Sequence, residues 1–352
     1  MSVMSFYIFT FLSLCLTFHR SIGYKFRPVT AEYNEQLQKF CYNPKFTTSE
    51  AEHKIMHGDQ VPKGKYPWAV ALVTSSGVSY CGGTLISPRH FITARHCIDS
   101  IHEFKTILVK VGGVCHSVKP EDGCPRSDMR VVEVEFAAYE PRQAGKEETD
   151  DDLRIRNMGH DMAIFQLKDD LTHHFDANHS IHDETRPACL PQLNEPLPRV
   201  MHVYGWGNDD LNDEYKDSAH LLEVDLVIYN ATTDPALGPL YKKVCASDRM
   251  YCMHPKDKSI PKDGARGDSG TGIIGRRGPL AYLFGSTIAG APKEAGFTMN
   301  IASRTQAYEH DICYYTGVCT EPDWVGKIDK DKVDMKLSKV YDPKKSQNVD
   351  FE

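Results

Sequence analysis

Gly267-Asp268-Ser269-Gly270 places a serine hydroxyl between small residues, and two upstream segments supply its expected partners: Thr93-Ala94-Arg95-His96-Cys97 and Asp161-Met162-Ala163-Ile164. A hydroxyl is a poor nucleophile at neutral pH, and it needs a base within hydrogen-bond reach and a group that orients this base. Each segment alone is a weak signal, since Gly-Asp-Ser-Gly is usually only a turn. Their joint occurrence in the order His, Asp, Ser indicates nucleophilic catalysis by Ser269.

The chain around these segments has the pattern of an all-β domain. Between about residues 66 and 302 the apolar runs are short, β-branched and separated by Gly, Pro and Asp, as in 68–73, 107–111 and 224–228. Many short strands at this spacing predict a sandwich or closed barrels. The pattern near 303–315 predicts one terminal helix.

The overall composition is that of a soluble globular protein, with 41% hydrophobic and 25% charged residues. The net charge is −7. Because there is no basic excess, the sequence gives no indication of nucleic acid or an anionic membrane surface as a partner.

The first 23 residues have the pattern of a signal peptide. The apolar run from Phe6 to Phe18 is 13 residues long, which is short for a membrane span. It is followed by Ser21-Ile22-Gly23, so we expect cleavage before Tyr24 and a secreted, extracellular protein with no membrane attachment afterwards. An uncleaved anchor or an N-terminal strand is the alternative.

The cysteines agree with secretion. Of 11 cysteines, Cys15 lies in the signal segment, and the even number that remains predicts a set of disulfides. Asn178-His179-Ser180 and Asn230-Ala231-Thr232 make Asn178 and Asn230 candidate glycosylation sites, although such triplets also arise by chance.

Three further landmarks accompany the His, Asp and Ser segments: Tyr66-Pro67-Trp68, Arg186-Pro187-Ala188-Cys189-Leu190-Pro191 and Tyr204-Gly205-Trp206-Gly207. With these landmarks, residues 41–315 resemble the chymotrypsin/trypsin family of serine proteases. The resemblance implies an all-β fold of two antiparallel six-stranded β-barrels with a C-terminal helix, and an active site in the cleft between the barrels.

The resemblance also implies a role for each residue of the site. Ser269 attacks the scissile carbonyl, His96 takes its proton and later passes it to the leaving amine, and Asp161 orients the imidazole. The backbone N–H groups of Gly267 and Ser269 form the oxyanion hole.

Lys54-Ile55-Met56-His57-Gly58 resembles the cleavage junction of family precursors. Cutting after Lys54 frees the α-amino group of Ile55, which in the family pairs with the carboxylate beside the nucleophile, here Asp268. The resemblance therefore implies an inactive precursor that an activating protease switches on.

The resemblance suggests a disulfide framework as well. Cys81–Cys97 brackets the histidine segment, and Cys41–Cys189 would tether the propeptide, with pairing of Cys41 elsewhere as the alternative. The other expected pairs are Cys245–Cys252, which resembles a shortened family bridge, and, by proximity alone, Cys115–Cys124 and Cys313–Cys319.

Asp263 stands six residues before Ser269, where the family places the floor of its primary specificity pocket. Gly290 and Gly296 fall where the family keeps the pocket walls open. A carboxylate at the floor favours a long cationic side chain, which implies cleavage after Arg or Lys. The alternative is that Asp263 is an ordinary loop residue in Lys262-Asp263-Gly264.

Several residues near the site depart from the family pattern. Ala265 replaces a cysteine, and the other replacements are Ile288-Ala289-Gly290 for Ser-Trp-Gly, Thr271-Gly272 for Gly-Pro, and Arg95 for a small residue. None removes a catalytic group. They leave open a catalytically weak or inactive homologue that binds partners, and, as a third class, a structural glycoprotein.

His96 and Asp161 are 65 residues apart, and the stretch between them includes the acidic run 147–152. This run could overhang the groove and favour basic substrates or inhibitors, but a solvated charge run is the commoner explanation and the one we prefer. His173, His174, His179 and His182 lack cysteine partners and helical spacing, so we expect a surface loop and neither a metal nor a cofactor.

The expected organisation is a signal peptide over 1–23, a propeptide over 24–54, a trypsin-like protease domain over 55–318 and a charged, disordered tail over 319–352. We expect a secreted serine endopeptidase that acts on protein or peptide substrates and can be controlled by a protein inhibitor.

Overall fold

The computed structural model describes residues 26–43, 59–74, 76–98, 107–141, 150–171, 185–208, 217–229, 238–256, 267–278, 280–290 and 299–339. Several residues singled out in the sequence lie outside the described residues: the signal segment, the Lys54–Ile55 junction, both candidate glycosylation sites, the histidines of 173–182, Asp263, Ala265, Gly296 and the last residues, 340–352. Among the described residues, no helix has the length and apolar character needed to cross a membrane.

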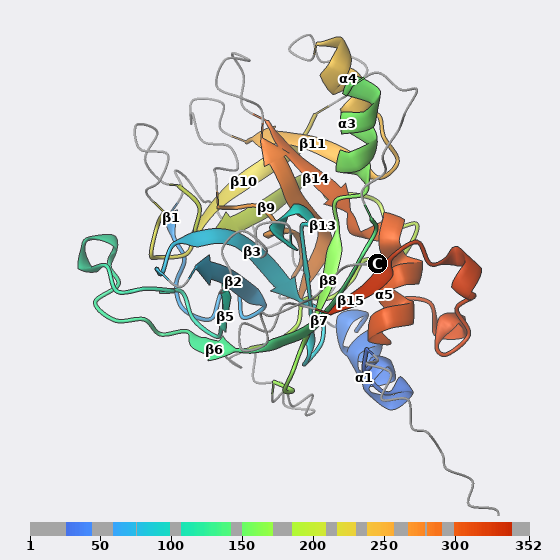
Figure 1. The fold of residues 1–352 in the computed structure, drawn as a ribbon, viewed down its shortest axis with the longest axis horizontal. Coiled ribbons are helices and arrows are strands. Elements are labelled where there is room, and N and C mark those ends of the chain that lie inside the picture. The colour runs from blue at the N-terminus through green and yellow to red at the C-terminus, as the bar shows by residue number, and fades with distance from the viewer. Residues whose placement is uncertain are drawn as a thin grey trace, which may run out of the picture.

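Strands dominate the structure and form two sheets (Figure 1). The first sheet is antiparallel, with the order β15-β7-β8-β4-β3-β2-β5-β6. Its strands are β2 (Ala69–Thr74), β3 (Ser79–Leu85), β4 (His90–Thr93), β5 (Ile107–Val111), β6 (Arg130–Val132), β7 (Val134–Tyr139), β8 (Ala163–Leu167) and β15 (Lys336–Lys339). Only Glu133 separates β6 from β7, so the chain itself joins two strands far apart in the order and the sheet curls round.

The second sheet closes into a barrel because β10 pairs with both β11 and β9, within the order β1-β10-β11-β14-β13-β12-β9. Its strands are β1 (Asp59–Gln60), β9 (Val200–Gly205), β10 (Leu222–Ile228), β11 (Met250–Pro255), β12 (Gly272–Arg277), β13 (Leu280–Gly290) and β14 (Asn300–Arg304). The expectation of an all-β fold of the chymotrypsin type is confirmed, with the first sheet curled and the second closed.

Large aromatic side chains fill the interior. Trp68 and Trp206 are both buried, and the rings of Tyr66 and Tyr204 stack at 4.7 Å, so that the segment before β2 packs on β9 of the other sheet. Burial of such side chains is a major source of folding free energy.

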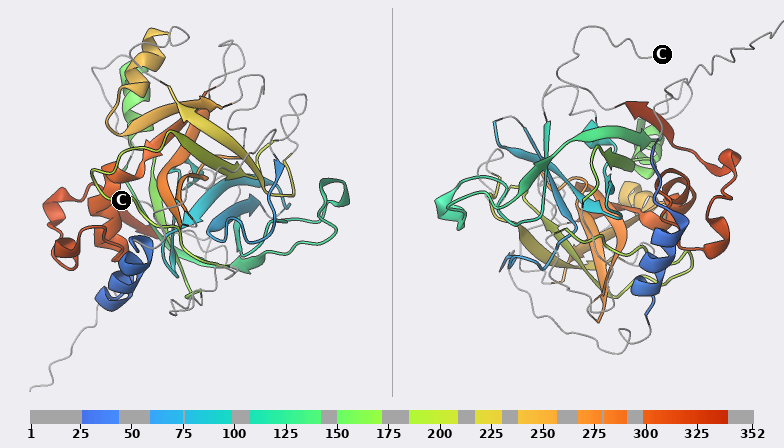
Figure 2. Two further views of the ribbon diagram at one scale, coloured as in Figure 1. Left: turned by 180° about the vertical axis from the view of Figure 1, so that it is seen from behind. Right: turned by 90° about the horizontal axis from the view of Figure 1, so that it is seen from below.

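Helices cover the outside of the sheets, and the expected C-terminal helix is present. The α-helices are α1 (Ala31–Cys41), α3 (Asp150–Gly159), α4 (Pro239–Cys245) and α5 (Glu309–Thr316), and the 3-10 turns are η2 (Pro120–Asp122), η4 (Thr305–Tyr308), η5 (Pro322–Trp324) and η6 (Lys330–Lys332). Figures 1 and 2 show α3 and α4 side by side at one end of the molecule, and α1 beside α5 at another.

The N-terminal segment packs on the protease fold. The Thr30 side chain caps α1 by accepting a hydrogen bond from the Tyr33 amide (3.1 Å), and Leu37 and Phe40 are buried. Further along the segment, the hydroxyl of Tyr42 donates to the carbonyl of Leu190 (2.7 Å). The part of the expected propeptide that the structure describes is therefore a packed element of the domain.

All ten expected cysteines form disulfides, and the pairs are those expected from the sequence: Cys41–Cys189, Cys81–Cys97, Cys115–Cys124, Cys245–Cys252 and Cys313–Cys319.

The expectation of a disordered tail does not hold for residues 320–339. β15 pairs with β7 at the edge of the first sheet, with Leu337 opposite Ala138. The Met335 amide also donates to Asp311 Oδ1 (2.7 Å), and Met335 is buried. Backbone pairing needs no apolar periodicity, so these charged residues gave no strand signal in the sequence.

Candidate active site

His96 and Asp161 form the most clearly defined pair of the site. Asp161 Oδ1 accepts a hydrogen bond from the His96 amide (2.7 Å), and Oδ2 lies 2.7 Å from His96 Nδ1. A carboxylate only accepts, so Nδ1 is the donor, and Nε2 remains to accept a proton.

The pairing of β4 with β8 brings these two residues together. Thr93 lies opposite Ala163 in this antiparallel pair. The chain leaving β4 therefore meets the chain entering β8, and His96 and Asp161 lie at that junction. The Cys81–Cys97 disulfide ties the histidine turn to β3.

A polar cluster fixes the end of α3, just before Asp161. The Tyr308 hydroxyl donates to the Gly159 carbonyl (2.6 Å), and Arg249 Nη1 donates to Glu140 Oε1 (2.8 Å). Glu140 also contacts His160, whose pKa is lowered by burial and by the Arg249 charge. Together, the side chains of Glu140, His160 and Arg249 fix the position of the chain just before Asp161.

The nucleophile loop, as we call residues 267–270 around the candidate nucleophile Ser269, lies against the histidine turn. The Gly82 amide donates to the Ser269 carbonyl (2.7 Å), and the Gly270 amide donates to the Thr287 carbonyl (2.7 Å). Gly82 adjoins Cys81, which is bonded to Cys97 next to His96. The main chain at Ser269 is therefore attached to the strand that carries the histidine disulfide.

Gly270 is required at its position. Its φ is +84°, and a Cβ there would collide with Thr93 Oγ1 and with the Gly82 carbonyl oxygen. Only glycine lets the nucleophile loop approach the end of β4 this closely.

Asp268, beside the candidate nucleophile, directs its carboxylate toward the end of β9. The Gly207 amide donates to Asp268 Oδ1 (2.8 Å). A Cβ on Gly205 would also meet this carboxylate, so glycines make the space that it occupies. The expected partner of Asp268, the Ile55 amino group, lies outside the described residues.

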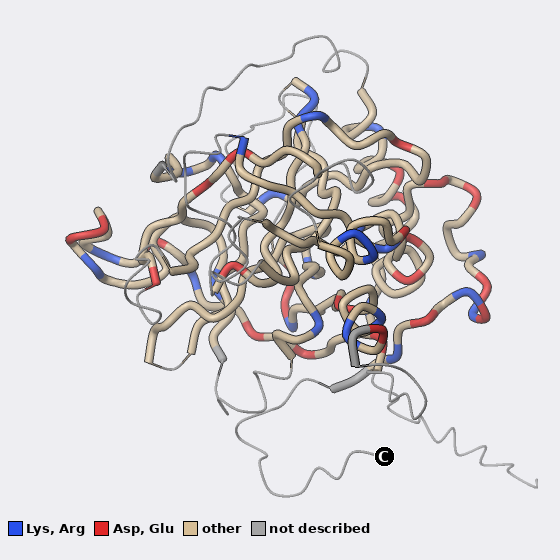
Figure 3. Tube along the Cα trace, turned by 90° about the horizontal axis from the view of Figure 1, so that it is seen from above, with Lys and Arg blue, Asp and Glu red and all other residues tan. Residues whose placement is uncertain are grey.

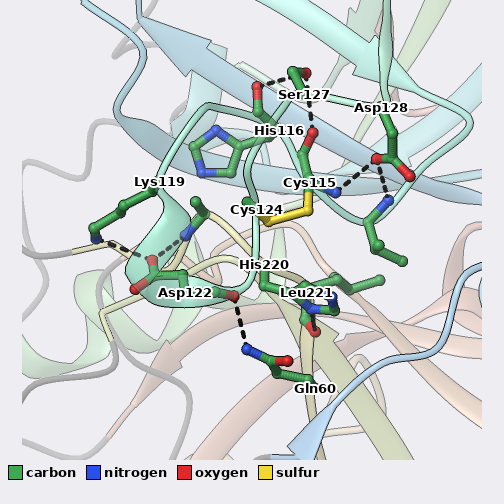
Figure 4. Close-up of a disulfide and its surroundings, with 12 residues drawn as sticks. Gln60, Cys115, His116, Lys119, Asp122, Cys124, Ser127, Asp128, His220 and Leu221 are labelled. Carbon is green, nitrogen blue, oxygen red and sulfur yellow. Dashed lines mark hydrogen bonds and ion pairs between the residues drawn. A yellow bond between two sulfur atoms is a disulfide. The ribbon is translucent and has the colours of Figure 1, made fainter.

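A disulfide-closed hairpin lies next to this region (Figure 4). The Asp122 Oδ2 atom accepts from the Ala219 amide (2.8 Å), and the Asp122 carbonyl accepts from Gln60 Nε2 (2.7 Å). The Ser218 amide in turn donates to the Gly207 carbonyl (3.2 Å). The Cys115–Cys124 hairpin thus joins the segment that follows the expected cleavage junction to the strand end that contacts Asp268.

His116 of the same hairpin is fully buried. Its Nε2 lies 3.1 Å from the Ser218 carbonyl and 3.3 Å from Asp217 Oδ2. The pKa of Asp217 is lowered: burial acts to raise it, but the hydrogen bonds from His116 and the Ser79 amide outweigh this effect.

The structure adds a residue that the sequence analysis missed. Asn300 lies opposite Gly290 on β13 and opposite Met253 on β11. It is fully buried, and neither atom of its amide has a hydrogen-bond partner among the described residues. Gly290 is three residues along β13 from Thr287, which binds the Gly270 amide. Asn300 is therefore a buried polar residue on the strand that pairs with the expected pocket-wall residue Gly290. The signal in the sequence was a single asparagine among apolar residues.

A cavity of about 310 Å³ adjoins the His–Asp pair and is lined by Arg95, His96, Arg154, Asn157, Met158 and Asp161. Helix α3 contributes Arg154, Asn157 and Met158. Of the acidic run 147–152, which could overhang the groove, residues 147–149 lie outside the described residues and 150–152 begin α3. Apart from the His–Asp pair, the charged groups lining the cavity within the described residues are arginines.

His96 also lies within 4.8 Å of the sulfurs of Cys81 and Cys97, a grouping that resembles a metal site. The disulfide uses both sulfurs, so this group offers no thiolate ligand.

The fold and the His–Asp pair next to a serine loop define a serine protease domain of the chymotrypsin type. Residues 55–312 match the trypsin family, and the chain belongs to this family. The chain is 26% identical over 280 residues to "CLIP domain-containing serine protease B15" of Anopheles gambiae, an alignment that covers 75% of this chain and 71% of that protein.

The chain is also similar to "Mannan-binding lectin serine protease 1". It is 24% identical to the Mus musculus protein over 248 residues and 26% identical to the Rattus norvegicus protein over 248 residues. Each alignment covers 66% of this chain but only 31% of the relative, so the chain spans under a third of these two proteins.

Proposed function

We propose that this protein is a secreted serine endopeptidase that hydrolyses peptide bonds through an acyl-enzyme. The observation that carries the proposal is the His96–Asp161 pair, in which both carboxylate oxygens bind one histidine and leave Nε2 as a base. Membership of the trypsin family supports it, as does the hydrogen bond from Gly82 of β3 to the Ser269 carbonyl, because the Cys81–Cys97 disulfide ties β3 to the histidine turn.

In this mechanism, Ser269 Oγ bonds to the scissile carbonyl carbon as its proton moves to His96 Nε2. The N–H groups of Gly267 and Ser269 stabilise the oxyanion. The C–N bond breaks, and His96 gives the proton to the leaving amine. Water then attacks the acyl carbon as His96 takes its proton. The bond from this carbon to Ser269 Oγ breaks, the acid leaves, and His96 returns the proton to Oγ.

Activation would begin with a cut after Lys54 by another protease. The new α-amino group of Ile55 would pair with Asp268, whose carboxylate reaches the end of β9 at Gly207. Losing one partner of a buried ion pair costs about 3–5 kcal/mol, which is enough to switch a loop between two states.

Cleavage after Arg or Lys is proposed from Asp263, with Gly290 and Gly296 at the pocket wall and Asn300 on the strand opposite Gly290. A buried carboxylate without a cation is costly, so discrimination would be large. The test is a peptide library cleaved by the activated protein and by Asp263→Ser: loss of an Arg/Lys preference supports this pocket, and an unchanged preference in the variant places the floor elsewhere.

The substrates would be proteins or peptides, with a protein inhibitor as a regulatory partner. The disulfides favour an extracellular location. The alternative is a catalytically weak homologue that acts by binding, and the replaced groove residues Ile288 and Ala289 are the observation in its favour.

Labelling with a fluorophosphonate probe separates the two functions. The precursor would be cut at Lys54, labelled, and compared with Ser269→Ala treated in the same way. Labelling of the cut wild type alone supports the endopeptidase. Absence of label on cut, folded wild type would favour the binding homologue.

A further inference from the structure

We propose that the cavity beside His96 accepts an acidic side chain of the substrate, with Arg154 as its specificity-determining residue. The inference rests on the proposed peptidase function and names the substrate class at the same site: peptides with Asp or Glu near the cleaved bond.

The position of the cavity ties its occupant to the reaction. His96 and Asp161 form part of its lining, so a group inside it lies beside the proposed base. An extended peptide advances about 3.3 Å per residue. A substrate side chain that fills the cavity therefore belongs to a residue within one or two positions of the scissile bond.

The charge of the cavity favours an anion. Arg95 and Arg154 line it, and the Arg95 guanidinium lies over the Tyr139 ring with its carbon 5.6 Å from the ring centre. Both oxygens of Asp161 already bind His96. Arg154 is exposed, and it makes no ion pair or hydrogen bond within the part of the chain that the structure describes.

The acidic residue nearest to Arg154 among the described side chains of α3 is engaged elsewhere. Asp152 Oδ1 lies 3.4 Å from Lys243 Nζ on α4. Figure 1 shows the two helices side by side, so this pair joins α3 to α4. Arg154 then remains as a charged group that α3 presents to the cavity.

The size and chemistry of the cavity suit a carboxylate side chain. A guanidinium binds a carboxylate through charge-assisted, often paired hydrogen bonds. The volume of about 310 Å³ leaves room for the methylene groups of Glu against Met158. A basic side chain would meet two like charges, and an apolar one would bury guanidinium surface without a partner.

The test compares matched peptides that differ only by Glu or Gln at each position near the cut. We expect the activated wild type to prefer Glu at one position by about 3- to 10-fold in kcat/KM at low ionic strength, because partly exposed ion pairs are modest in strength. The preference should shrink as salt is added.

The Glu/Gln ratio is kcat/KM of the Glu peptide divided by kcat/KM of the Gln peptide. Arg154→Glu should bring this ratio below one, and Arg154→Gln should bring it near one. The matched control is Arg156→Glu, which makes the same charge change on the same helix at a residue outside the lining. Fluorophosphonate labelling of each variant shows whether its active site is intact. An unchanged Glu/Gln ratio in Arg154→Glu, or an equal change in Arg156→Glu, would overturn the inference.

A binding measurement separates failure of this inference from failure of the proposed function. Fluorescent Glu and Gln peptides would be titrated onto Ser269→Ala with and without Arg154→Glu. If wild type is never labelled but Ser269→Ala still binds the Glu peptide through Arg154, the peptidase proposal fails and the acidic subsite stands. If wild type is labelled and no Glu preference is found, the subsite fails alone.

The test also distinguishes the cavity from the overall charge of the protein, which is −7 and does not attract anions. Figure 3 shows that acidic and basic residues both recur along the described trace. A general attraction of anions would act on Glu at every position of the peptide. A preference for Glu at one position only therefore indicates binding in the cavity.

Discussion

Asn34 and Cys319 exchange two hydrogen bonds although they are 285 residues apart: Asn34 Nδ2 donates to the Cys319 carbonyl (3.1 Å), and the Cys319 amide donates to Asn34 Oδ1 (3.0 Å). Both residues are buried. The segment before the expected cleavage junction thereby pairs with the residue that ends the Cys313–Cys319 disulfide. Together with Cys41–Cys189, this contact would keep the segment bound after cleavage.

Asn34→Ala should lower the free energy of unfolding by about 1–3 kcal/mol, because it leaves the buried amide and carbonyl of Cys319 unpaired. Urea denaturation in the Ser269→Ala background measures this effect without self-cleavage. The control is Gln36→Ala, an exposed position on the same helix. Equal stability of the two variants would contradict the role of this contact.

Ser269→Ala and His96→Ala should each abolish peptidase turnover while leaving the secreted, disulfide-bonded fold intact. Asp161→Asn should lower kcat by about 10⁴-fold, since an amide cannot hold the required imidazole tautomer. The nucleophile and the base act as one unit, so the double variant should be little worse than either single one. Circular dichroism verifies the fold; full activity of any folded variant refutes the assignment.

Asp268→Asn should give a protein that is cut after Lys54 but remains inactive, and Lys54→Gln should give an intact, inactive precursor. The ion pair needs a protonated α-amino group, whose reference pKa is about 7.7–8.0. Pairing would raise this pKa in the folded state. The ion pair therefore stabilises the active form fully when the pH is below the reference pKa. Activity should fall as the pH rises through the raised pKa of the folded state. Equal activity of cut and uncut protein would rule out the switch.

Asn300→Leu should make the protein more stable and less active. The buried amide of Asn300 has no hydrogen-bond partner within the part of the chain that the structure describes, so a similar-sized apolar side chain should raise the free energy of unfolding by about 1–3 kcal/mol. The same change should reduce kcat/KM on Arg and Lys substrates, since it removes a hydrogen-bonding group from the proposed pocket wall. A variant that gains stability and keeps its substrate profile would show that Asn300 does not contact substrate.

Glu309→Gln should change how stability depends on pH. Burial raises the pKa of Glu309 from 4.5 to about 8, although the Thr320 hydroxyl (3.2 Å) acts to lower it. The folded state thus favours the protonated acid, and stability is lost as the pH rises from 4.5 through about 8. Above pH 8 the variant should exceed wild type by about 2–4 kcal/mol, with little difference at pH 4.

Urea denaturation across this pH range tests the Glu309 prediction, with Glu32→Gln as the exposed control. Parallel pH profiles of wild type and Glu309→Gln would show that this carboxyl group does not titrate differently on folding.

Much of the fold followed from local patterns. Short β-branched runs predicted the strands, and the glycine and cysteine positions around His96 and Ser269 indicated the family to which the chain belongs. These signals are local, because a strand needs particular residue types in a short run and a motif fixes residue identities over a few positions.

The partners of the C-terminal residues were not predictable in this way. β15 is charged, and it pairs with β7 through its backbone, so its side chains carry no pattern that marks the contact. The same is true of Asn34, whose partner atoms belong to the main chain of a distant residue.

The sequence by itself indicated the family, the candidate triad and the Cys81–Cys97 disulfide, because each depends on residue identity in a short motif. Only the tertiary structure decided that Arg154 of α3 lines a cavity beside His96 and that Asn300 is buried opposite Gly290. Both depend on how strands and helices far apart in the chain are packed, and register and helix rotation are set by the whole core rather than by neighbouring residues.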